Sequence, residues 1–108
     1  MNTTSDIQRL RASADQAHQL LKALANRDRL LLLCQLVDGE RNVGELEGLL
    51  GIVQPTLSQQ LAVLRREGLV DTRREGKQVY YRVASREALA ILHTLYGLYC
   101  AEENTDEH

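Results

Sequence analysis

The chain contains no tryptophan, no phenylalanine, one proline and only two cysteines among its 108 residues. Without the two bulkiest aromatic side chains, its core must be built from leucine, valine, isoleucine, alanine and four tyrosines. Seven glycines and a single proline leave little room for long flexible linkers. A chain of this length forms one domain with a modest core, and we expect that domain to span residues 1–108.

Long apolar runs are also missing. No segment approaches the roughly 18 consecutive apolar residues that a membrane span requires. The opening residues, MNTTSDIQRL, have neither the basic segment nor the apolar segment of a secretory signal. These absences predict a cytoplasmic protein that has no membrane partner.

The chain has no overall excess of positive charge, since its formal net charge is −2. Taken alone, this value argues against nucleic acid as a partner, but the distribution of charge reverses the argument. Residues 54–83 contain six cations and three carboxylates, whereas the acidic tail at 102–108 holds four carboxylates. A local basic patch of this kind steers one face of a protein toward phosphate.

Hydrophobic periodicity predicts two helices in the first third of the chain. The first, over 6–25 with Ser5 as its cap, carries a narrow heptad-like apolar seam that suits pairing with another helix. The second, about 27–37, opens at Asn26 and contains the run LLLLCQLV. We expect the second helix to be buried on nearly every side, at the centre of the domain.

Two further helices are predicted on either side of a tight turn that begins at Gly51. Asn42 followed by Glu45 resembles a capping box and starts a short third helix. Pro55 fits the first position of a fourth helix, where its missing N–H costs nothing. Gln54 is a mediocre N-cap for that helix.

The fourth helix combines an apolar stripe with a polar opening turn. Leu57, Leu61 and Leu64 follow one another at spacings of four and three, as on a buried helix face. Polar side chains in the first turn are expected to face away from the core. A solvated surface would explain them equally well unless the neighbouring elements suggest a ligand. These side chains are Ser58, Gln59 and Gln60.

A β-hairpin should follow the fourth helix. Residues 78–83 alternate between apolar and polar side chains, and 70–74 would form the partner strand, joined through the turn at 75–76. Ser85 would then cap a last helix, whose apolar residues over 88–99 cover more than one face. Such a wide apolar surface predicts contact with a second subunit as well as with the core. The cations expected at the hairpin tip are Arg73, Arg74 and Lys77.

The predicted order of elements is that of a winged helix-turn-helix, a mainly α fold of five helices with a two-stranded wing. The helix-turn-helix would span about 43–67 and the wing about 69–83. In this motif the second helix enters the major groove of DNA, where serine and glutamine hydrogen-bond to base edges and cations hold phosphates. The predicted DNA-binding residues are Gln54, Thr56, Ser58, Gln59, Gln60, Arg65, Arg66, Arg73, Arg74 and Lys77.

Residues 15–100 resemble the ArsR/SmtB family of transcriptional repressors. The most specific matching segments are LSQQLAVLRREGLV and GKQVYYRV. The resemblance implies a homodimer that pairs through its first and last helices, here about 6–25 and 85–101. It also implies binding to double-stranded operator DNA with an inverted repeat, from which an inducer releases the protein.

Many members of this family sense metals, but the metal-binding positions are not filled here. The family's Cys-x-Cys motif falls on Asn42 and Gly44, which supply no thiolate. His93 has no Asp-x-His partner in the last helix, and His18 and His108 are isolated. Because zinc takes about four nitrogen, sulfur or oxygen ligands, we expect no metal and no other cofactor.

The two cysteines are placed similarly to the pair in the dithiol branch of the family, the BigR, SqrR, YgaV and HlyU type. Cys34 lies in the second, buried helix and Cys100 at the end of the last. The resemblance implies that reactive sulfur species or oxidants link the two thiols and release the operator. Buried structural cysteines are the alternative, in an anti-silencing activator or a repressor that does not use them.

An enzyme is not expected. A nucleophilic cysteine needs a nearby base or positive field, whereas His93 precedes Cys100 by two helical turns, roughly 10 Å. The sequence also contains no glycine-rich phosphate loop and no paired-carboxylate motif.

Overall fold

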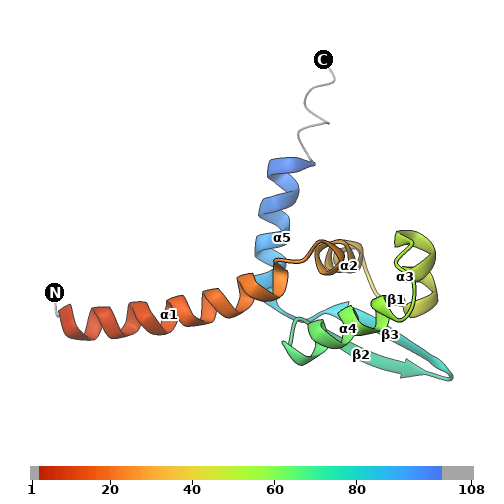
Figure 1. Cartoon of the computed structure of the whole chain (residues 1–108), viewed down its shortest axis with the longest axis horizontal. Coiled ribbons are helices and arrows are strands. Elements are labelled where there is room, and N and C mark those ends of the chain that lie inside the picture. Colours follow the sequence, from red (N-terminus) through yellow and green to blue (C-terminus); the bar gives the residue numbers. More distant parts are fainter. Residues whose placement is uncertain (1–2, 101–108) are drawn as a thin grey trace, which may run out of the picture.

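A computed structural model describes the backbone of residues 3–100 and the side chains of residues 6–100. Within this range, five helices and a three-stranded antiparallel sheet confirm the predicted mainly helical, winged helix-turn-helix fold (Figure 1). The predicted acidic tail at 102–108, residue 101 of the last helix and His108 lie outside the described residues. The elements are α1 (Thr3–Leu24), α2 (Arg27–Val37), β1 (Arg41–Asn42), α3 (Val43–Leu50), α4 (Thr56–Arg66), β2 (Val70–Glu75), β3 (Gln78–Val83) and α5 (Arg86–Tyr99).

Side-chain caps fix the starts of three helices, as the sequence predicts. The Asn26 side chain accepts a hydrogen bond from the backbone of Arg29, and α2 begins between them. Asn42 and Glu45 form both hydrogen bonds of a capping box at the start of α3. Ser85 caps α5 in the same way. Each cap satisfies backbone N–H groups that the first helical turn leaves without a partner.

Two predicted helix starts are wrong by a short distance. Helix α1 begins at Thr3, so Ser5 lies inside its first turn and is not its N-cap. Thr3, Thr4 and Ser5 are three consecutive hydroxyl residues, and the sequence pattern does not show which of their positions begins the helix. Helix α4 begins at Thr56, and Pro55 occupies the capping position one residue earlier than predicted.

The sheet contains one strand more than the sequence predicts. Strands β2 and β3 pair from Val70–Val83 to Glu75–Gln78, and the turn between them uses Gly76 at a φ of 63°. The two-residue strand β1 then pairs with the other edge of β3. Two residues are too few to show an alternating pattern, so β1 has no sequence signal of its own.

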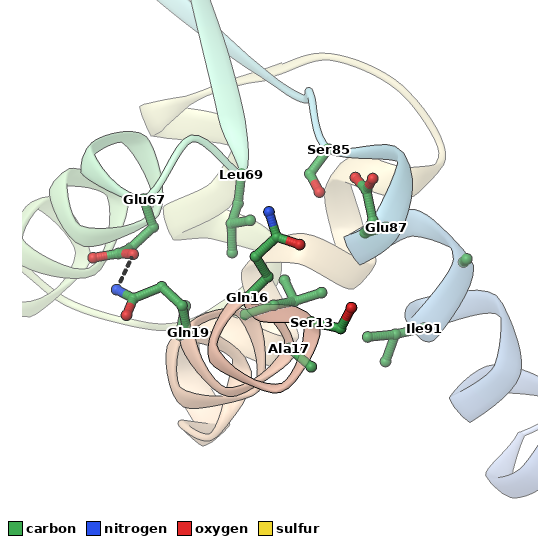
Figure 2. Close-up of a pocket in the computed structure, with 12 residues that line it drawn as sticks. Ser13, Gln16, Ala17, Gln19, Glu67, Leu69, Ser85, Glu87 and Ile91 are labelled. Atoms are coloured by element: carbon green, nitrogen blue, oxygen red, sulfur yellow. Dashed lines mark hydrogen bonds between the residues drawn. The ribbon is translucent and has the colours of Figure 1, made fainter. Parts of the chain in front are cut away.

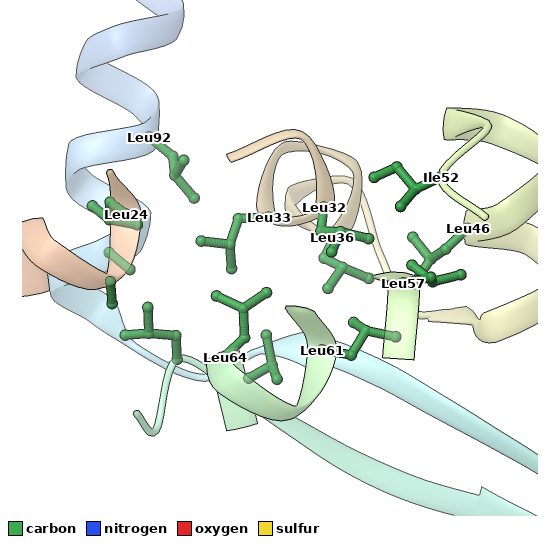
Figure 3. Close-up of a cluster of buried hydrophobic side chains, with 14 residues drawn as sticks. Leu24, Leu32, Leu33, Leu36, Leu46, Ile52, Leu57, Leu61, Leu64 and Leu92 are labelled. Carbon is green, nitrogen blue, oxygen red and sulfur yellow. The ribbon is translucent and has the colours of Figure 1, made fainter. Parts of the chain in front are cut away.

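The core lies between α2, α4 and the ends of the other elements (Figure 3). The predicted stripe of α4, Leu57, Leu61 and Leu64, is fully buried. Helix α2 contributes fewer buried residues than expected, because only one side of it faces the core and Cys34 is exposed on another. The expectation that α2 is buried on nearly every side is therefore wrong. The buried residues of α2 are Leu32, Leu33 and Leu36.

Helices α1 and α5 extend away from this core in different directions (Figure 1). Only the end of α1 is anchored, through the buried side chains of Ala23 and Leu24. Helix α5 is anchored near its start, through Ala88 and Leu92. No helix within residues 3–100 combines the length and apolar character that a membrane crossing requires.

Candidate nucleic-acid interface

The turn between α3 and α4 holds the second helix in a defined orientation. Gly51 ends α3 with a φ of 70°, a left-handed conformation that glycine adopts without steric cost. The side-chain oxygen of Gln54 accepts a hydrogen bond from the backbone of Ser58 at 3.1 Å. Gln54 thus serves the first turn of α4, where Pro55 makes no side-chain capping hydrogen bond.

The outward face of α4 is polar at its start and cationic at its end. Because the leucine stripe is buried, Ser58 and Gln59 are exposed at the opening turn and Thr56 is half-buried. Arg65 and Arg66 are exposed one to two turns later. Arg66 lies 3.8 Å from the Glu67 carboxylate, a long ion pair on the surface that leaves its charge accessible. Hydrogen-bonding groups and positive charge therefore share one helix face.

Gln60 departs from the predicted arrangement, in which the whole polar trio faces away from the core. Its side chain is half-buried, and its oxygen accepts a hydrogen bond from Nη1 of Arg29 at 2.9 Å. Gln60 is thus joined to α2. No sequence signal identifies Arg29 as the partner, because the two residues are 31 positions apart.

Arg73 does not lie at the tip of the wing, as predicted, but in the middle of β2, opposite Tyr80. Its guanidinium pairs with the carboxylates of Glu75 and Glu40, each at 2.8 Å, and lies over the Tyr80 ring at 4.7 Å from its centroid. The hydrogen bonds that Arg73 donates to Glu75 and Glu40 raise the pKa of its guanidinium. Arg73 therefore clamps the wing, and its charge is largely balanced within the chain.

Two other exposed wing cations lie further along the hairpin. Arg74 is exposed near the end of β2, and Lys77 is exposed in the turn itself. No ion pair involves either side chain among residues 6–100. These two cations, unlike Arg73, are available to phosphate.

The two cysteines are free thiols, and both are exposed. Cys34 is on α2 and Cys100 is the C-cap of α5, two helices that pack against each other. Partial burial of the sulfur raises the pKa of the Cys34 thiol, and the negative charge of a Cys100 thiolate raises it further. The second effect is a long-range Coulomb interaction between the two thiols. The two predicted sensing residues are therefore within electrostatic range of each other, although Cys34 is exposed and not buried as expected.

Helices α1 and α5 expose large apolar side chains on the faces that do not pack against the core. Leu10 is 67% exposed and Tyr99 is 76% exposed. Groups of large exposed apolar side chains are typical of surfaces that bind another protein. Between the two helices lies a hollow of about 690 Å³, lined mainly by α1 and α5 (Figure 2). Ile7, Leu21, Tyr96 and Leu98 are the other large apolar residues exposed on these helices.

Metal-binding side chains are not gathered anywhere in the part of the chain that the structure describes. No three residues drawn from histidine, cysteine, aspartate and glutamate come together within it. The absence of a metal stays a prediction for the protein as a whole.

The comparisons with known proteins agree with this geometry. The family model described as "Bacterial regulatory protein, arsR family" matches residues 26–72. The chain is 57% identical over 84 residues to the biofilm growth-associated repressor of Agrobacterium fabrum, covering 78% of this chain and 72% of that protein. It is 46% identical over 95 residues to the transcriptional activator HlyU of Vibrio cholerae, covering 88% of each.

The structure is also similar to a crystal structure of the transcriptional repressor BigR from Xylella fastidiosa. The TM-score is 0.79 at 46% sequence identity, and the match covers 94% of this chain and 99% of that one. The agreement therefore includes the helix-turn-helix, the wing and both long helices.

Proposed function

This chain belongs to the ArsR family of bacterial regulatory proteins, and we propose that it represses transcription as a homodimer whose DNA binding is controlled by Cys34 and Cys100. Its relatives are transcriptional regulators, and the chain accordingly belongs to a non-enzymatic family. The observation that carries the proposal is the polar start of α4, exposed beside a cationic wing.

Helix α4 reads the operator in the major groove. Ser58 and Gln59 hydrogen-bond to base edges, glutamine pairing best with adenine. Gln54 uses its oxygen to cap α4, which leaves its amide N–H groups to donate to a phosphate, and Thr56 is placed beside it. Phosphate contacts along the helix and wing fix the register of the protein on DNA. They are made by Arg65, Arg66, Arg74 and Lys77, while Arg73 acts by holding the wing in place.

A second copy of the chain covers the exposed faces of α1 and α5. Both helices carry large exposed apolar side chains and a hollow lies between them, so a partner's helices would bury apolar surface on each. The dimer would then present two α4 helices about one DNA turn apart, roughly 34–36 Å, to an inverted repeat. Sedimentation of the reduced protein at micromolar concentration should give a dimer, and a monomer would contradict this arrangement.

The cysteines supply the switch. Because the pKa of Cys34 is raised, Cys100 is the first nucleophile. Its thiolate attacks a sulfane sulfur atom of a persulfide or polysulfide, and the rest of the donor leaves as a thiolate. The Cys34 thiolate then attacks Cys100 Sγ and displaces the added sulfur as hydrosulfide, which forms a disulfide. The two thiols lose two electrons, which reduce the sulfane sulfur, and their protons pass to solvent.

Other oxidised products follow from the same residues. Cys100 can also carry two added sulfur atoms. The Cys34 thiolate then attacks the added sulfur that is bonded to Cys100 Sγ and displaces the outer one as hydrosulfide. One sulfur atom remains between the two cysteines. Such a longer bridge relaxes the Cα separation of about 4.4–6.8 Å that a plain disulfide demands. A peroxide reaches the disulfide through a sulfenic acid on Cys100, with water as the leaving species.

Linking the cysteines ties α2, which packs against α4, to the proposed dimer helix α5. A shift of α2 against α5 would change the distance between the two α4 helices of the dimer. That distance must match the fixed spacing of successive major grooves. A coupling of about 1–3 kcal/mol between the two sites would be typical.

The test starts with reduced protein and a random DNA pool, from which the operator is selected. The selected DNA is then titrated with reduced protein, polysulfide-treated protein and peroxide-treated protein, and intact-mass spectrometry identifies each product. Loss of binding together with an internal Cys34–Cys100 link is expected. Full affinity of the linked protein would show that the cysteines are not the switch.

A second candidate function is suggested by the relative named as a transcriptional activator. In that case the chain would displace another DNA-binding protein and thereby activate transcription, with structural cysteines. A reporter gene placed behind the selected operator separates the two candidates, because deletion of a repressor raises expression and deletion of an activator lowers it.

A further inference from the structure

One guanidinium connects three helices. Arg29 lies in the first turn of α2, and its Nε donates a hydrogen bond to the carbonyl of Ala23 at 2.6 Å. Its Nη2 lies 3.4 Å from the carbonyl of Lys22. Its Nη1 donates to the side-chain oxygen of Gln60 in α4 at 2.9 Å. The last turn of α1 and the middle of α4 are therefore joined through a single side chain.

The chemistry of this junction suits arginine specifically. The final carbonyls of a helix have no partner inside it and carry the negative end of its dipole. The planar guanidinium of Arg29 donates to the Ala23 carbonyl through Nε and to the Gln60 side chain through Nη1. Lysine presents its donors from one point and cannot span both partners in this way.

A second polar bridge runs in parallel with the first. The side-chain amide of Gln19, in α1, donates to the carboxylate of Glu67 at 2.9 Å (Figure 2). Glu67 is the C-cap of α4. Helix α4 is thus linked to α1 at two places along its length, although the two helices are far apart in the sequence.

We propose that Arg29 and Gln60 form a positioning pair, which fixes the reading helix α4 relative to the dimer helix α1. Gln60 then serves DNA binding by orienting Ser58 and Gln59 on the same helix rather than by reading a base itself. The inference rests on the proposed function, because it concerns how the two copies of α4 are aimed at the operator. A tilt of α4 against α1 would misplace both copies with respect to a fixed groove separation.

The experiment is a double-mutant cycle on reduced protein, with the selected operator as ligand. Gln60→Ala and Arg29→Ala should each weaken operator binding about tenfold, the order of one hydrogen bond to a charged group. The double variant should lose little more than either single variant, since both remove the same bridge. Gln59→Ala is the matched control, an exposed neighbour whose effect should multiply with that of Arg29→Ala.

A second measurement separates positioning from reading and from simple stability. Titration against operators with single base-pair changes should give Arg29→Ala and Gln60→Ala the same profile, whereas Gln59→Ala should lose its preference at one position. The urea midpoint of Gln60→Ala should remain well above the titration conditions, so that its loss of binding is not a loss of folded protein. Arg29→Lys, which keeps the charge without the fork, should behave as Arg29→Ala does and covers the case in which the alanine variant does not fold.

The inference is overturned if Gln60→Ala loses preference at one base pair while Arg29→Lys keeps full affinity, because Gln60 is then a reader. Multiplicative losses in the double variant overturn it as well. If the unchanged protein selects no DNA at all, the proposed function fails first, and the two failures are distinguished by that initial selection.

Discussion

The guanidinium of Arg73 lies 2.8 Å from the carboxylate of Glu40, so the middle of the wing is held to the segment between α2 and β1. Glu75 neutralises the same guanidinium from the other side. Two neighbouring cations, Arg74 and Lys77, have no such partner among residues 6–100. The three wing cations therefore have different roles, although they are equivalent in the sequence.

This difference is measurable as a salt dependence. Lys77→Ala or Arg74→Ala should each reduce the slope of log affinity against log salt by about two units, because each removes one phosphate contact from both copies in the dimer. Arg73→Ala should change the slope by less than half a unit, since its charge is already balanced. Titrations of the operator between 50 and 200 mM salt, the range over which roughly 10³-fold effects are seen, measure the slopes. Equal slopes for all three variants would show that Arg73 reaches phosphate.

The exposed polar start of α4 predicts a loss of both affinity and selectivity on truncation. Ser58→Ala and Gln59→Ala should each cost about 1–3 kcal/mol of operator binding where the side chain makes a base-specific pair. Binding to unrelated DNA should change little, because phosphate contacts remain. Competition between operator and scrambled duplex measures the ratio. A uniform loss on both duplexes would place these side chains on the phosphate backbone instead.

The proposed switch predicts that single cysteine variants are constitutive. Cys34→Ser and Cys100→Ser should bind the operator with the affinity of the reduced protein and keep that affinity after polysulfide treatment. Neither variant can close an internal sulfur bridge. Anisotropy titrations before and after treatment, with reductant added back as a reversal control, give the answer. Release of DNA by either treated variant would contradict the dithiol mechanism.

The raised pKa of Cys34 predicts slow, strongly pH-dependent alkylation. Burial and the Cys100 charge both disfavour its thiolate, so the midpoint of its alkylation rate against pH should lie above the ordinary value of 9.0. In Cys100→Ser the midpoint should fall, because the charge is removed, but should stay above 9.0, because burial is the larger cause. Iodoacetamide labelling followed by peptide mass spectrometry measures both midpoints. A midpoint below the ordinary value would show that Cys34 is the activated thiol.

The buried stripe of α4 predicts a large effect on stability. Leu61 is fully buried, so Leu61→Ala should lower the free energy of unfolding by about 2–5 kcal/mol. Leu49→Ala is the matched control, since Leu49 is 52% exposed and its truncation should cost less than about 0.5 kcal/mol. Urea unfolding at one protein concentration compares them, because dimer formation makes stability depend on concentration. Similar losses for both variants would mean that Leu49 is covered in the dimer.

Several features of this protein were determined by the sequence alone, because they depend on neighbours within one or two helical turns. The capping residues Asn26, Asn42 and Ser85 set helix starts through bonds to residues three positions away. The spacing of Leu57, Leu61 and Leu64 determined which face of α4 is buried, and hence that Ser58 and Gln59 point outward.

Tertiary structure decided which of the remaining polar residues are free to bind a ligand. Gln60 and Arg73 look equivalent to their neighbours in the sequence, but partners 31 and 33 residues away engage them. Strand β1 exists only because β3 offers it an edge, and the helices that carry Cys34 and Cys100 meet only because α2 packs against α5. Hydrogen bonds and ion pairs between distant segments leave no periodic trace in the chain, since they depend on how the core brings the helices together.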